Sequence, residues 1–240
     1  MCTLEKRGSI FILTLTGPDA EHRLNPTTID SIKSALSTIK SQATPGSVLI
    51  TTADGKFFSN GFDLKWAQQP GTPSAFLTRL HHMVESFKPV VADLLSLPIP
   101  TIAAVTGHAA AAGMLFAVSH DYVVMRGDKG VMYMSEMDMG MTFPEYFMAM
   151  FRSKIGKVGA RRDVLMGAKK VKAGEAVDMG LVDGVYEDGE KTMDAALRMA
   201  EELGKRKWNG EVYAEIRKAM FPEICGVLGL TSKSVVAARL

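Results

Sequence analysis

The chain has 240 residues, of which 47% are hydrophobic and 22% are charged, and its formal net charge at neutral pH is +2. This composition excludes a mainly disordered chain, because enough apolar side chains are present to form a core. The length fits one large domain or a domain with an appendage. The balanced charge argues against a dedicated nucleic-acid-binding protein. The two cysteines, Cys2 and Cys225, lie near opposite ends, which favours a reducing compartment or an organelle matrix over secretion.

The first elements predicted along the chain are a strand, a helix and a second strand. Alternation of Ile, Phe, Leu and Thr predicts a strand over residues 8–16, whose apolar run is too short for a signal peptide. Pro26 opens a segment with apolar residues at helical spacing, namely Ile29, Ile32, Leu36 and Ile39. The apolar, β-branched run at 47–52 then predicts a buried strand.

The middle of the chain continues to alternate between strand and helix. Ser74 is the predicted N-cap of a helix that runs to about Leu95, with a break or kink near Pro89. A strand, a helix, a strand and an extended segment follow at residues 101–105, 109–120, 121–125 and 131–139. From Pro144 onward the pattern is mainly helical. The predicted fold class is therefore α/β with a helical C-terminal part.

Motifs for several common reaction types are missing. The sequence holds no P-loop, no dinucleotide-binding G-x-G-x-x-G after a strand, no H-E-x-x-H and no G-x-S-x-G. The adjacent His81 and His82 have no recognised metal-ligand spacing. The most apolar long stretch, residues 101–118, is too short and too weakly apolar for a membrane span. Nucleotide hydrolysis, nicotinamide redox chemistry, zinc hydrolysis and serine hydrolysis therefore lose their usual sequence support, and we expect no metal site and no membrane span.

Two loops rich in small residues are the most informative segments. In the first, FFSNGFDL at 57–64, a strand ends in small residues and a glycine, which lets backbone N–H groups point into a cleft. In the second, at 102–115, a strand leads to a helix whose start is almost free of side chains: Ala110, Ala111, Ala112 and Gly113. A helix N-terminus has unpaired N–H donors, and two donors that converge on one oxygen form an oxyanion hole. Either loop alone also fits an ordinary turn or a packed helix.

Together, and in this order, the loops make the sequence resemble the enoyl-CoA hydratase/isomerase (crotonase) superfamily. FFSNGFDL at 57–64 is similar to its first CoA-loop signature, and SLPIPTIAAVTGHAAAAG at 96–113, followed by Asp121, is similar to its central signature. Residues 171–183 resemble a later helix and turn, and the resemblance covers roughly residues 5–205. It implies a crotonase-like spiral of ββα turns with a helical C-terminal trimerisation region. It also implies an acyl-CoA thioester substrate, with coenzyme A as part of the substrate and no separate cofactor.

The resemblance further implies how the chain is divided and which residues bind the substrate. We expect a spiral acyl-CoA-binding core at 1–190 and a C-terminal helical region with a targeting tail at 191–240. The expected substrate-binding residues lie on the two loops and are Ser59, Asn60, Gly61, Phe62, Asp63, Leu64, Ala111, Ala112, Gly113 and Leu115. The backbone amides of Asn60 and Ala112 match the oxyanion-hole positions. Asn60 replaces the family's frequent Ala, and Ala111–Ala112 replace a Gly-Gly, but neither change removes an N–H donor.

Catalytic side chains separate the reaction types within the superfamily. Hydratases carry two glutamates, and the first of these positions is Leu115 here, whereas the second matches Glu136 in SEMDMG. Leu115 cannot bind water, but a single base can remove the α-proton of a 3-enoyl thioester and return a proton at the γ carbon. The resemblance is therefore closest to the plant peroxisomal group of Δ3,Δ2-enoyl-CoA isomerases, which act in fatty acid β-oxidation.

Three alternatives remain open. Dienoyl-CoA isomerases use an acid at the Leu115 position and another eight residues after the glutamate, which is Pro144 here, with Glu145 adjacent. A residual 2-enoyl-CoA hydratase is the second alternative, with Glu145 or Asp138 as its second acid, and a non-catalytic acyl-CoA-binding scaffold is the third. An adaptable acyl pocket and an ordinary core both explain the methionines near Glu136: Met132, Met134, Met137, Met139 and Met141.

Two further features concern charge and cellular address. Residues 152–172 hold eight basic residues and one acid, which fits a solvated helical face or a positive rim that attracts a phosphorylated ligand. The last residues, Ala238-Arg239-Leu240, resemble the C-terminal peroxisomal address. We therefore expect a peroxisomal protein that binds an import receptor. The resemblance adds a homotrimer or a dimer of trimers, with no nucleic-acid partner.

Overall fold

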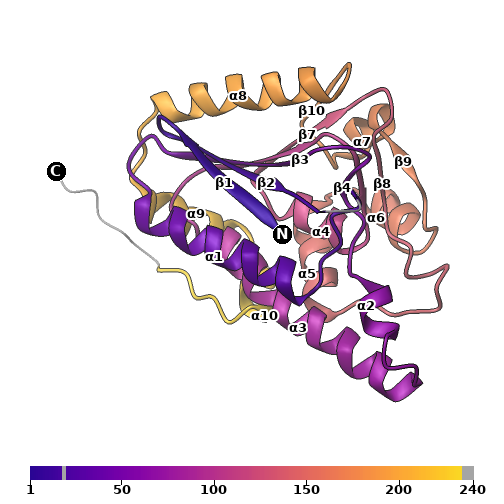
Figure 1. Cartoon of the computed structure of the whole chain (residues 1–240). Coiled ribbons are helices and arrows are strands. Elements are labelled where there is room, and N and C mark those ends of the chain that lie inside the picture. The colour runs from indigo at the N-terminus through magenta and orange to yellow at the C-terminus, as the bar shows by residue number, and fades with distance from the viewer. Residues whose placement is uncertain (18–19, 234–240) are drawn as a thin grey trace.

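Two β-sheets organise the protein, for which a computed structural model describes residues 1–17 and 20–233 (Figure 1). The six strands of the larger sheet lie in the order β1 (Cys2–Arg7), β2 (Ile10–Leu15), β3 (Val48–Ala53), β5 (Thr101–Val105), β7 (Tyr122–Arg126) and β10 (Gly184–Tyr186). The four strands of the smaller sheet lie in the order β4 (Phe57–Ser59), β6 (His108–Ala110), β8 (Val131–Tyr133) and β9 (Val171–Lys172). Neighbouring strands are parallel except in the β1–β2 and β8–β9 pairs.

From β3 to β8, consecutive strands alternate between the two sheets. β3, β5 and β7 are parallel neighbours in the larger sheet, and each is followed directly by a strand of the smaller sheet, β4, β6 or β8. Helices lead the chain back to the larger sheet after β4 and β6, namely α2 (Leu64–Gln68) with α3 (Pro73–Ser96), and α4 (Ala112–Val118). α5 (Glu145–Lys154) follows β8. The chain thus advances by one strand at each turn. This is the spiral of ββα turns that the resemblance implies.

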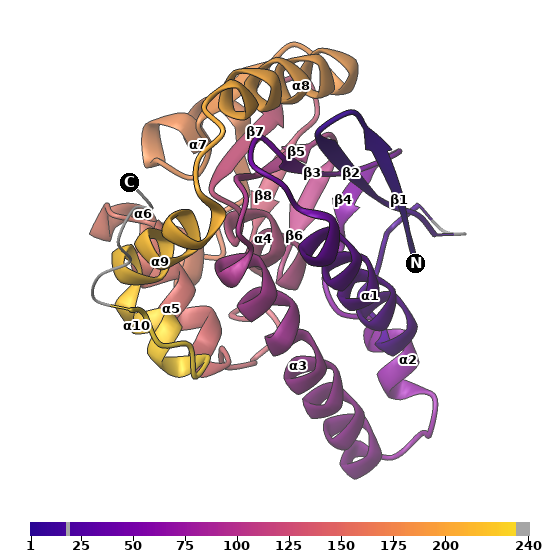
Figure 2. The same ribbon diagram turned by 90° about the vertical axis from the view of Figure 1, so that its left-hand side faces the viewer.

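The larger sheet is covered on both faces. α8 (Gly189–Lys205) lies along one face, where its Ala196 and Ala200 pack in a buried cluster with isoleucines and valines of the strands (Figures 1 and 2). The main core lies on the other face and includes residues of α1 (Pro26–Gln42), α3 and α4. All residues of β3 and β5 are buried, and continuous apolar runs of this kind are typical of parallel strands covered on both faces.

The remaining helices lie in the last part of the chain, around β9 and after β10. They are α6 (Val158–Leu165), α7 (Ala173–Met179), α9 (Gly210–Met220) and α10 (Pro222–Val227). α9 packs against α3, and α10 packs against α5 (Figure 2). α8 itself is packed on the spiral, because it shares a buried cluster with the larger sheet. Within the described residues, none of the helices is both long and apolar enough to cross a membrane.

The helix predicted at 109–120 starts later than expected. His108–Ala110 forms β6, and α4 begins only at Ala112. Alanine favours a helix, but in the smaller sheet Ala109 pairs with Met132 and the neighbouring His108 pairs with Phe57. Tertiary pairing therefore overrides the local propensity at this point.

Two other elements differ from the sequence pattern. The helix expected from Ser74 begins at Pro73, with Thr72 as its N-cap, and it continues through Pro89. Pro89 removes one backbone hydrogen bond, but the neighbouring Val90 and Val91 are fully buried, and this packing holds the helix together. The pattern also does not reveal β1, because this edge strand is largely exposed and ends in charged residues.

Candidate active site

The two small-residue loops lie in contact. A Cβ atom built on Gly61 would lie 3.0 Å from the carbonyl oxygen of Ala110 and 3.3 Å from the amide nitrogen of Ala112. A Cβ atom on Gly113 would lie 2.3 Å from the carbonyl oxygen of Ser59, which is closer than any side chain tolerates. Gly61 also has a φ of +73°, so both space and backbone conformation require glycine there. The juxtaposition of the loops is therefore built into their small residues.

The backbone amide of Ala112 is a free donor at the start of α4. No acceptor for this amide is found among the described residues. The preceding residue, Ala111, has a φ of 49° and donates its own amide to the carbonyl oxygen of Tyr133 at 2.8 Å. This unusual conformation turns the chain from β6 into α4 and leaves the next N–H unpaired.

The structure corrects the assignment of the second donor. The amide of Asn60 donates to the carbonyl oxygen of Glu21 at 2.8 Å, so it is already engaged. Phe62 pairs with Leu24 in an isolated parallel bridge, through hydrogen bonds of 2.8 and 3.2 Å made by the residues on either side of Phe62. The Phe62 amide therefore faces away from Leu24, and it has no acceptor in the described part of the chain. Phe62 is thus a better candidate donor than Asn60, because only its N–H is free.

Glu136 lies in a tight turn after β8 and is 9% exposed. Its backbone carbonyl accepts hydrogen bonds from the amides of Met139 and Met141, at 3.1 and 2.9 Å, and these bonds fix the turn. Its Oε2 atom is buried and has no hydrogen-bond partner among the described residues. Burial raises the pKa of the Glu136 carboxyl above its ordinary value of 4.5, and hydrogen bonds from backbone amides of the turn oppose this rise only in part. A desolvated carboxylate with a free oxygen can act as a base.

Glu136 faces a cavity of about 260 Å³ that both loops help to form. The lining residues are Arg23, Asn60, Phe62, Leu64, Leu80, Ala111, Ser135, Glu136, Met139 and Met141. No other carboxylate of the described chain lines this cavity, and the described residues include no cluster of His, Cys, Asp and Glu that could hold a metal ion. A single base in a largely apolar cavity, close to free backbone amides, can move a proton on a compound activated by a carbonyl group.

Several residues predicted to bind substrate support the loops instead. The Ser59 hydroxyl donates to the carbonyl oxygen of His22 at 2.9 Å. The Asp63 carboxylate caps α2 by accepting from the amide of Trp66 at 3.0 Å. Leu115 is fully buried in the main core and does not line the cavity. Leu115 therefore supplies no polar group to the site, and its place in the core does not support the predicted contact with substrate.

The methionines of this region occupy three environments. Met132 and Met134 are fully buried in the main core. Met139 and Met141 line the cavity, whereas Met137 is 61% exposed and does not. Some of these methionines are therefore ordinary core residues, and others are part of the wall of the cavity.

Two lining residues have no motif that marks them in the sequence. Arg23 lies before the N-cap of α1 and forms a 2.6 Å ion pair with Glu21. Leu80 reaches the cavity from α3, where it shares the buried helix face with Met83 and Phe87. The helical periodicity of α3 identifies Leu80 as a buried residue, but it does not show that a cavity lies beside it.

The basic segment 152–172 does not contribute to this cavity. Three of its residues form surface ion pairs, Arg152 with Glu223, Arg162 with Asp163 and Lys169 with Glu175. Lys154 instead points inward and donates to the carbonyl oxygen of His120 at 2.9 Å, and burial lowers its pKa to about 8. These contacts favour the solvated-face interpretation over a positive rim at the site.

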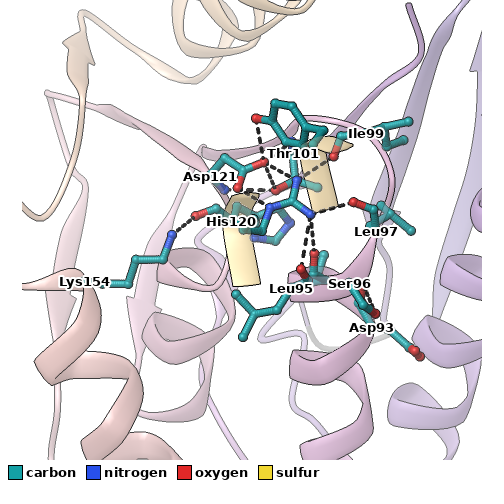
Figure 3. Close-up of polar contacts among 12 residues, drawn as sticks. Asp93, Leu95, Ser96, Leu97, Ile99, Thr101, His120, Asp121 and Lys154 are labelled. Carbon is teal, nitrogen blue, oxygen red and sulfur yellow. Dashed lines mark hydrogen bonds and ion pairs between the residues drawn. The ribbon is translucent and has the colours of Figure 1, made fainter. Parts of the chain in front are cut away.

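Asp121, although part of the central signature, lies outside the cavity and has a structural role (Figure 3). Its carboxylate accepts from the amide of Thr101 at 2.9 Å and forms a 2.6 Å ion pair with Arg217 of α9. Arg217 is 3% exposed and also donates to the carbonyl oxygens of Leu97 and Ile99, both at 2.6 Å. We refer to Arg217, Asp121 and these carbonyl groups as the α9 clasp. It fixes α9 to the end of α3 and to the start of β5 and β7.

A larger cavity, of about 620 Å³, lies beside the α9 clasp and does not include Glu136. Its acidic residue, Asp121, is already paired with Arg217, so the cavity holds no carboxylate free to act as a base. Its apolar rim includes Ile216 and Met220, which are 62% and 64% exposed. Size alone therefore does not identify the chemical site of this molecule.

The fold and the site agree with sequence comparison. The pattern of the enoyl-CoA hydratase/isomerase family matches residues 5–221, and the chain belongs to this family. The peroxisomal enoyl-CoA delta isomerase 2 of Arabidopsis thaliana is 58% identical over 241 residues, which cover 100% of both chains. Enoyl-CoA delta isomerase 3 of the same plant is 55% identical over 100% of both chains. Its peroxisomal enoyl-CoA delta isomerase 1 is 51% identical over 93% of this chain and 91% of that one.

Solved structures share the same fold. A probable enoyl-CoA hydratase from Mycobacterium tuberculosis superposes with a TM-score of 0.83 at 21% identity, over 95% of this chain and 91% of that one. An enoyl-CoA hydratase from Polaromonas superposes with a TM-score of 0.75 at 26% identity, over 90% and 81% of the two chains. The resemblance to the superfamily and to its plant isomerase group is thus confirmed.

Proposed function

We propose that the protein is an enoyl-CoA delta isomerase, which moves the double bond of a 3-enoyl-CoA thioester to the trans-2 position during fatty acid β-oxidation. One observation carries this proposal. Glu136 is the single described carboxylate in its cavity, and one of its oxygens is buried without a partner. The names of the three Arabidopsis relatives, all enoyl-CoA delta isomerases, support the same activity.

Glu136 acts as the only base in this reaction. Its carboxylate removes a proton from the α carbon of the 3-enoyl thioester, and the electron pair delocalises through the adjacent carbonyl group onto the thioester oxygen and through the double bond onto the γ carbon. The neutral carboxylic acid then returns the proton to the γ carbon, which leaves the double bond in the 2 position. The raised pKa of Glu136 suits both halves of this transfer, because it strengthens the base and keeps the proton at hand.

Backbone amides stabilise the dienolate that forms between the two proton transfers. Negative charge develops on the thioester oxygen, and the free N–H groups of Ala112 and Phe62 are the donors assigned to it. The start of α4 adds the positive end of its dipole at Ala112. Asn60 contributes to the cavity wall, but its amide is not assigned to the oxyanion hole.

The competing reactions find less support around this cavity. A hydratase needs a second carboxylate to hold and activate water, but Leu115 is apolar and buried. Asp138 and Glu145, the other candidates for a second acid of a hydratase or a dienoyl-CoA isomerase, are exposed and do not line the cavity. A binding scaffold has no need of a buried, unpartnered base, because such a group lowers stability without adding affinity.

The first test compares substrates and a single substitution. We expect the purified protein to isomerise 3-enoyl-CoA much faster than it hydrates 2-enoyl-CoA or converts dienoyl-CoA. Glu136→Gln keeps the shape of the side chain and removes its basicity, so isomerase turnover should fall on the order of 100-fold or more. Affinity for the CoA ester should stay nearly the same. The absorbance of the conjugated product measures turnover, and calorimetric titration measures affinity.

A matched variant controls for changes in the turn that carries Glu136. Asp138→Asn removes an exposed carboxylate from the same turn, outside the cavity, and should leave turnover unchanged. Near-normal turnover in the Glu136→Gln protein would rule out the single-base mechanism. Equal rates of hydration and isomerisation in the wild type would instead point to a hydratase.

The assembly and the cellular location are also part of the proposal. We infer a homotrimer or a dimer of trimers, and the exposed apolar side chains of Ile216 and Met220 beside the larger cavity support burial of that face by another copy. Light scattering distinguishes these states. The proposed peroxisomal address, Ala238-Arg239-Leu240, lies outside the described residues, and two Arabidopsis relatives are named as peroxisomal.

A further inference from the structure

Met139 is the one described methionine that is both exposed and part of the cavity lining, since Met141 lines the cavity but is only partly exposed. Its side chain is 45% exposed, and it lines the cavity that contains Glu136. Met137 is more exposed, at 61%, but lies outside the cavity, whereas Met132 is fully buried. Oxidants in solution therefore reach a methionine side chain that lines the cavity of Glu136.

A hydrogen-bond donor lies beside the sulfur of Met139. The hydroxyl of Ser135 lies 3.6 Å from the Met139 sulfur and donates toward it. Thioether sulfur is a weak acceptor, but the oxygen of a sulfoxide is a strong one. After oxidation, Ser135 would donate to that oxygen, so the polar product would be held in the cavity wall. Because the Met139 amide is bonded to the carbonyl of Glu136, this polar group stays close to the base.

We propose that Met139 is a redox-sensitive modification site, at which a hydroperoxide reversibly lowers the activity of the enzyme. A sulfur lone pair of Met139 attacks one oxygen of the hydroperoxide, an S–O bond forms and the O–O bond breaks. The sulfur is oxidised by two electrons to the sulfoxide, and the hydroperoxide is reduced to water or an alcohol after proton transfer to the leaving oxygen. Reduction by a methionine sulfoxide reductase restores the thioether.

The sulfoxide acts on the site in two ways. It replaces an apolar wall with a polar one, which weakens binding of a fatty-acyl chain. It also brings a dipole and water toward Glu136, whose basicity depends on burial. We expect kcat/KM for isomerisation to fall roughly tenfold, as for one poorly matched polar group in an apolar site. This inference rests on the proposed isomerase function.

The test treats the full-length protein with hydrogen peroxide and follows two quantities in the same aliquots. Peptide mass mapping measures the sulfoxide content at each methionine, and the isomerase assay measures kcat/KM. We expect sulfoxide to form at Met139 and Met137 before it forms at Met132 and Met134. The loss of activity should follow the oxidation of Met139 in time. A methionine sulfoxide reductase should restore activity, whereas its dithiol reductant alone, which also reverses cysteine oxidation, should not.

Two variants separate Met139 from its neighbour. Each is compared with its own activity before oxidation. Met139→Leu should keep that activity under conditions that inactivate the wild type, and Met137→Leu should be inactivated like the wild type. Complete oxidation of Met139 without loss of kcat/KM would overturn the proposal, as would equal inactivation of the Met139→Leu protein.

The same experiment distinguishes failure of this inference from failure of the proposed function. The activity of the untreated protein is measured first, and an absence of isomerase activity at that stage contradicts the function itself. The effect of Met139 oxidation on affinity for an acyl-CoA is then measured by calorimetry. If the untreated protein has no isomerase activity and full oxidation of Met139 leaves the acyl-CoA affinity unchanged, the proposal that Met139 is a redox-sensitive site is contradicted as well.

Discussion

Glu136 is a carboxyl group that the folded chain leaves without a partner at one oxygen, and its titration should be visible in catalysis. Burial raises its pKa above 4.5, and only the ionised form is a base. We therefore expect kcat/KM to fall as pH decreases through a midpoint above 4.5. The pH profile of isomerisation measures this midpoint, with circular dichroism at each pH as the control for folding. A midpoint at or below 4.5 would contradict the assignment.

The effect of the same group on stability has the opposite direction. Because the folded state favours the protonated form of Glu136, its contribution to stability is greatest at low pH and is lost as pH rises through the raised pKa. The Glu136→Gln protein, which cannot ionise, should therefore unfold at a higher urea concentration than the wild type at pH 8. The difference should shrink toward acidic pH.

Leu115 should resist conversion into a second catalytic acid. Leu115→Glu places a carboxyl in the main core, where Leu115 is fully buried, and should cost about 2–4 kcal/mol of stability. Isomerase activity should drop, and the gain in 2-enoyl-CoA hydration should be small, because Leu115 does not line the cavity. The ratio of hydration to isomerisation on matched chain lengths measures the change. Leu115→Met, which nearly conserves volume, is the control.

The residues of the site were only partly predictable. Glu136 and Ala112 follow from matches to motifs. The structure places Glu136 in the turn that follows β8 and Ala112 at the first residue of α4, just after β6, whereas the pattern put Glu136 inside an extended segment at 131–139 and Ala112 inside a helix at 109–120. The choice between Asn60 and Phe62 as donor depends on which way each amide points. That direction is set by Glu21 and Leu24, on a segment far away in the sequence. A motif gives the position of a loop but not the hydrogen bonds that other segments make with it.

At the level of elements, α9 depends on one arginine. Arg217→Met removes the cation that compensates the buried Asp121 carboxylate and leaves several carbonyl oxygens without their donor. Breaking a buried ion pair in this way should cost about 3–5 kcal/mol. Urea unfolding measures the loss. The exposed pair of Arg162 and Asp163 provides the control, since Arg162→Met should cost less than about 1 kcal/mol.

The charge state of Asp121 is consistent with this role. Burial alone would raise the pKa of its carboxyl, but the charge and hydrogen bonds of Arg217, together with the charge of Lys154 and the amide of Thr101, hold that pKa below its ordinary value. The clasp therefore contributes stability above the ordinary pKa of an aspartate and loses it as pH falls through the lowered value. If Arg217→Met lowers the free energy of unfolding no more than Arg162→Met does, α9 does not depend on the ion pair between Arg217 and Asp121.

Elements with a strong local pattern were predictable, and elements defined by their neighbours were not. The apolar spacing of α1 and the β-branched run of β3 identify both elements almost to their ends. β6 includes two alanines, which have high helix propensity, and its pairing with β4 and β8 makes it a strand. β9 has two residues, which is too short to leave a period in the sequence.

At the scale of the whole molecule, the spiral itself could not be derived from periodicity. Alternation of strand and helix predicts an α/β fold, but it does not show that successive strands belong to two different sheets. That expectation came from the resemblance, and the strand orders of the two sheets agree with it. The helical C-terminal part was predictable as helix, although its packing on the larger sheet through Ala196 and Ala200 was not.

The address of the molecule should be separable from its fold. Deletion of Ala238-Arg239-Leu240 should make the protein cytosolic and leave isomerase turnover and the melting temperature unchanged, because a receptor-read tripeptide is recognised outside the packed chain. The position of a fluorescent fusion, with the label at the N-terminus, measures import. In the full-length protein, the double change Ala238→Ser/Arg239→Lys keeps the address and should leave import intact. Unchanged import of the truncated protein would refute the signal.

The α9 clasp also bears on the order in which this protein folds. Arg217 bonds to Leu94 and Ile99, which lie 123 and 118 positions earlier in the chain. Contacts over such separations carry a large loop-closure entropy and slow folding, because nothing rewards the closure until both ends are in place. The loops that hold Ala112 and Glu136 are synthesised long before Arg217. The residues that form the candidate site are therefore all synthesised before the bond that locks the end of the chain to its middle can form.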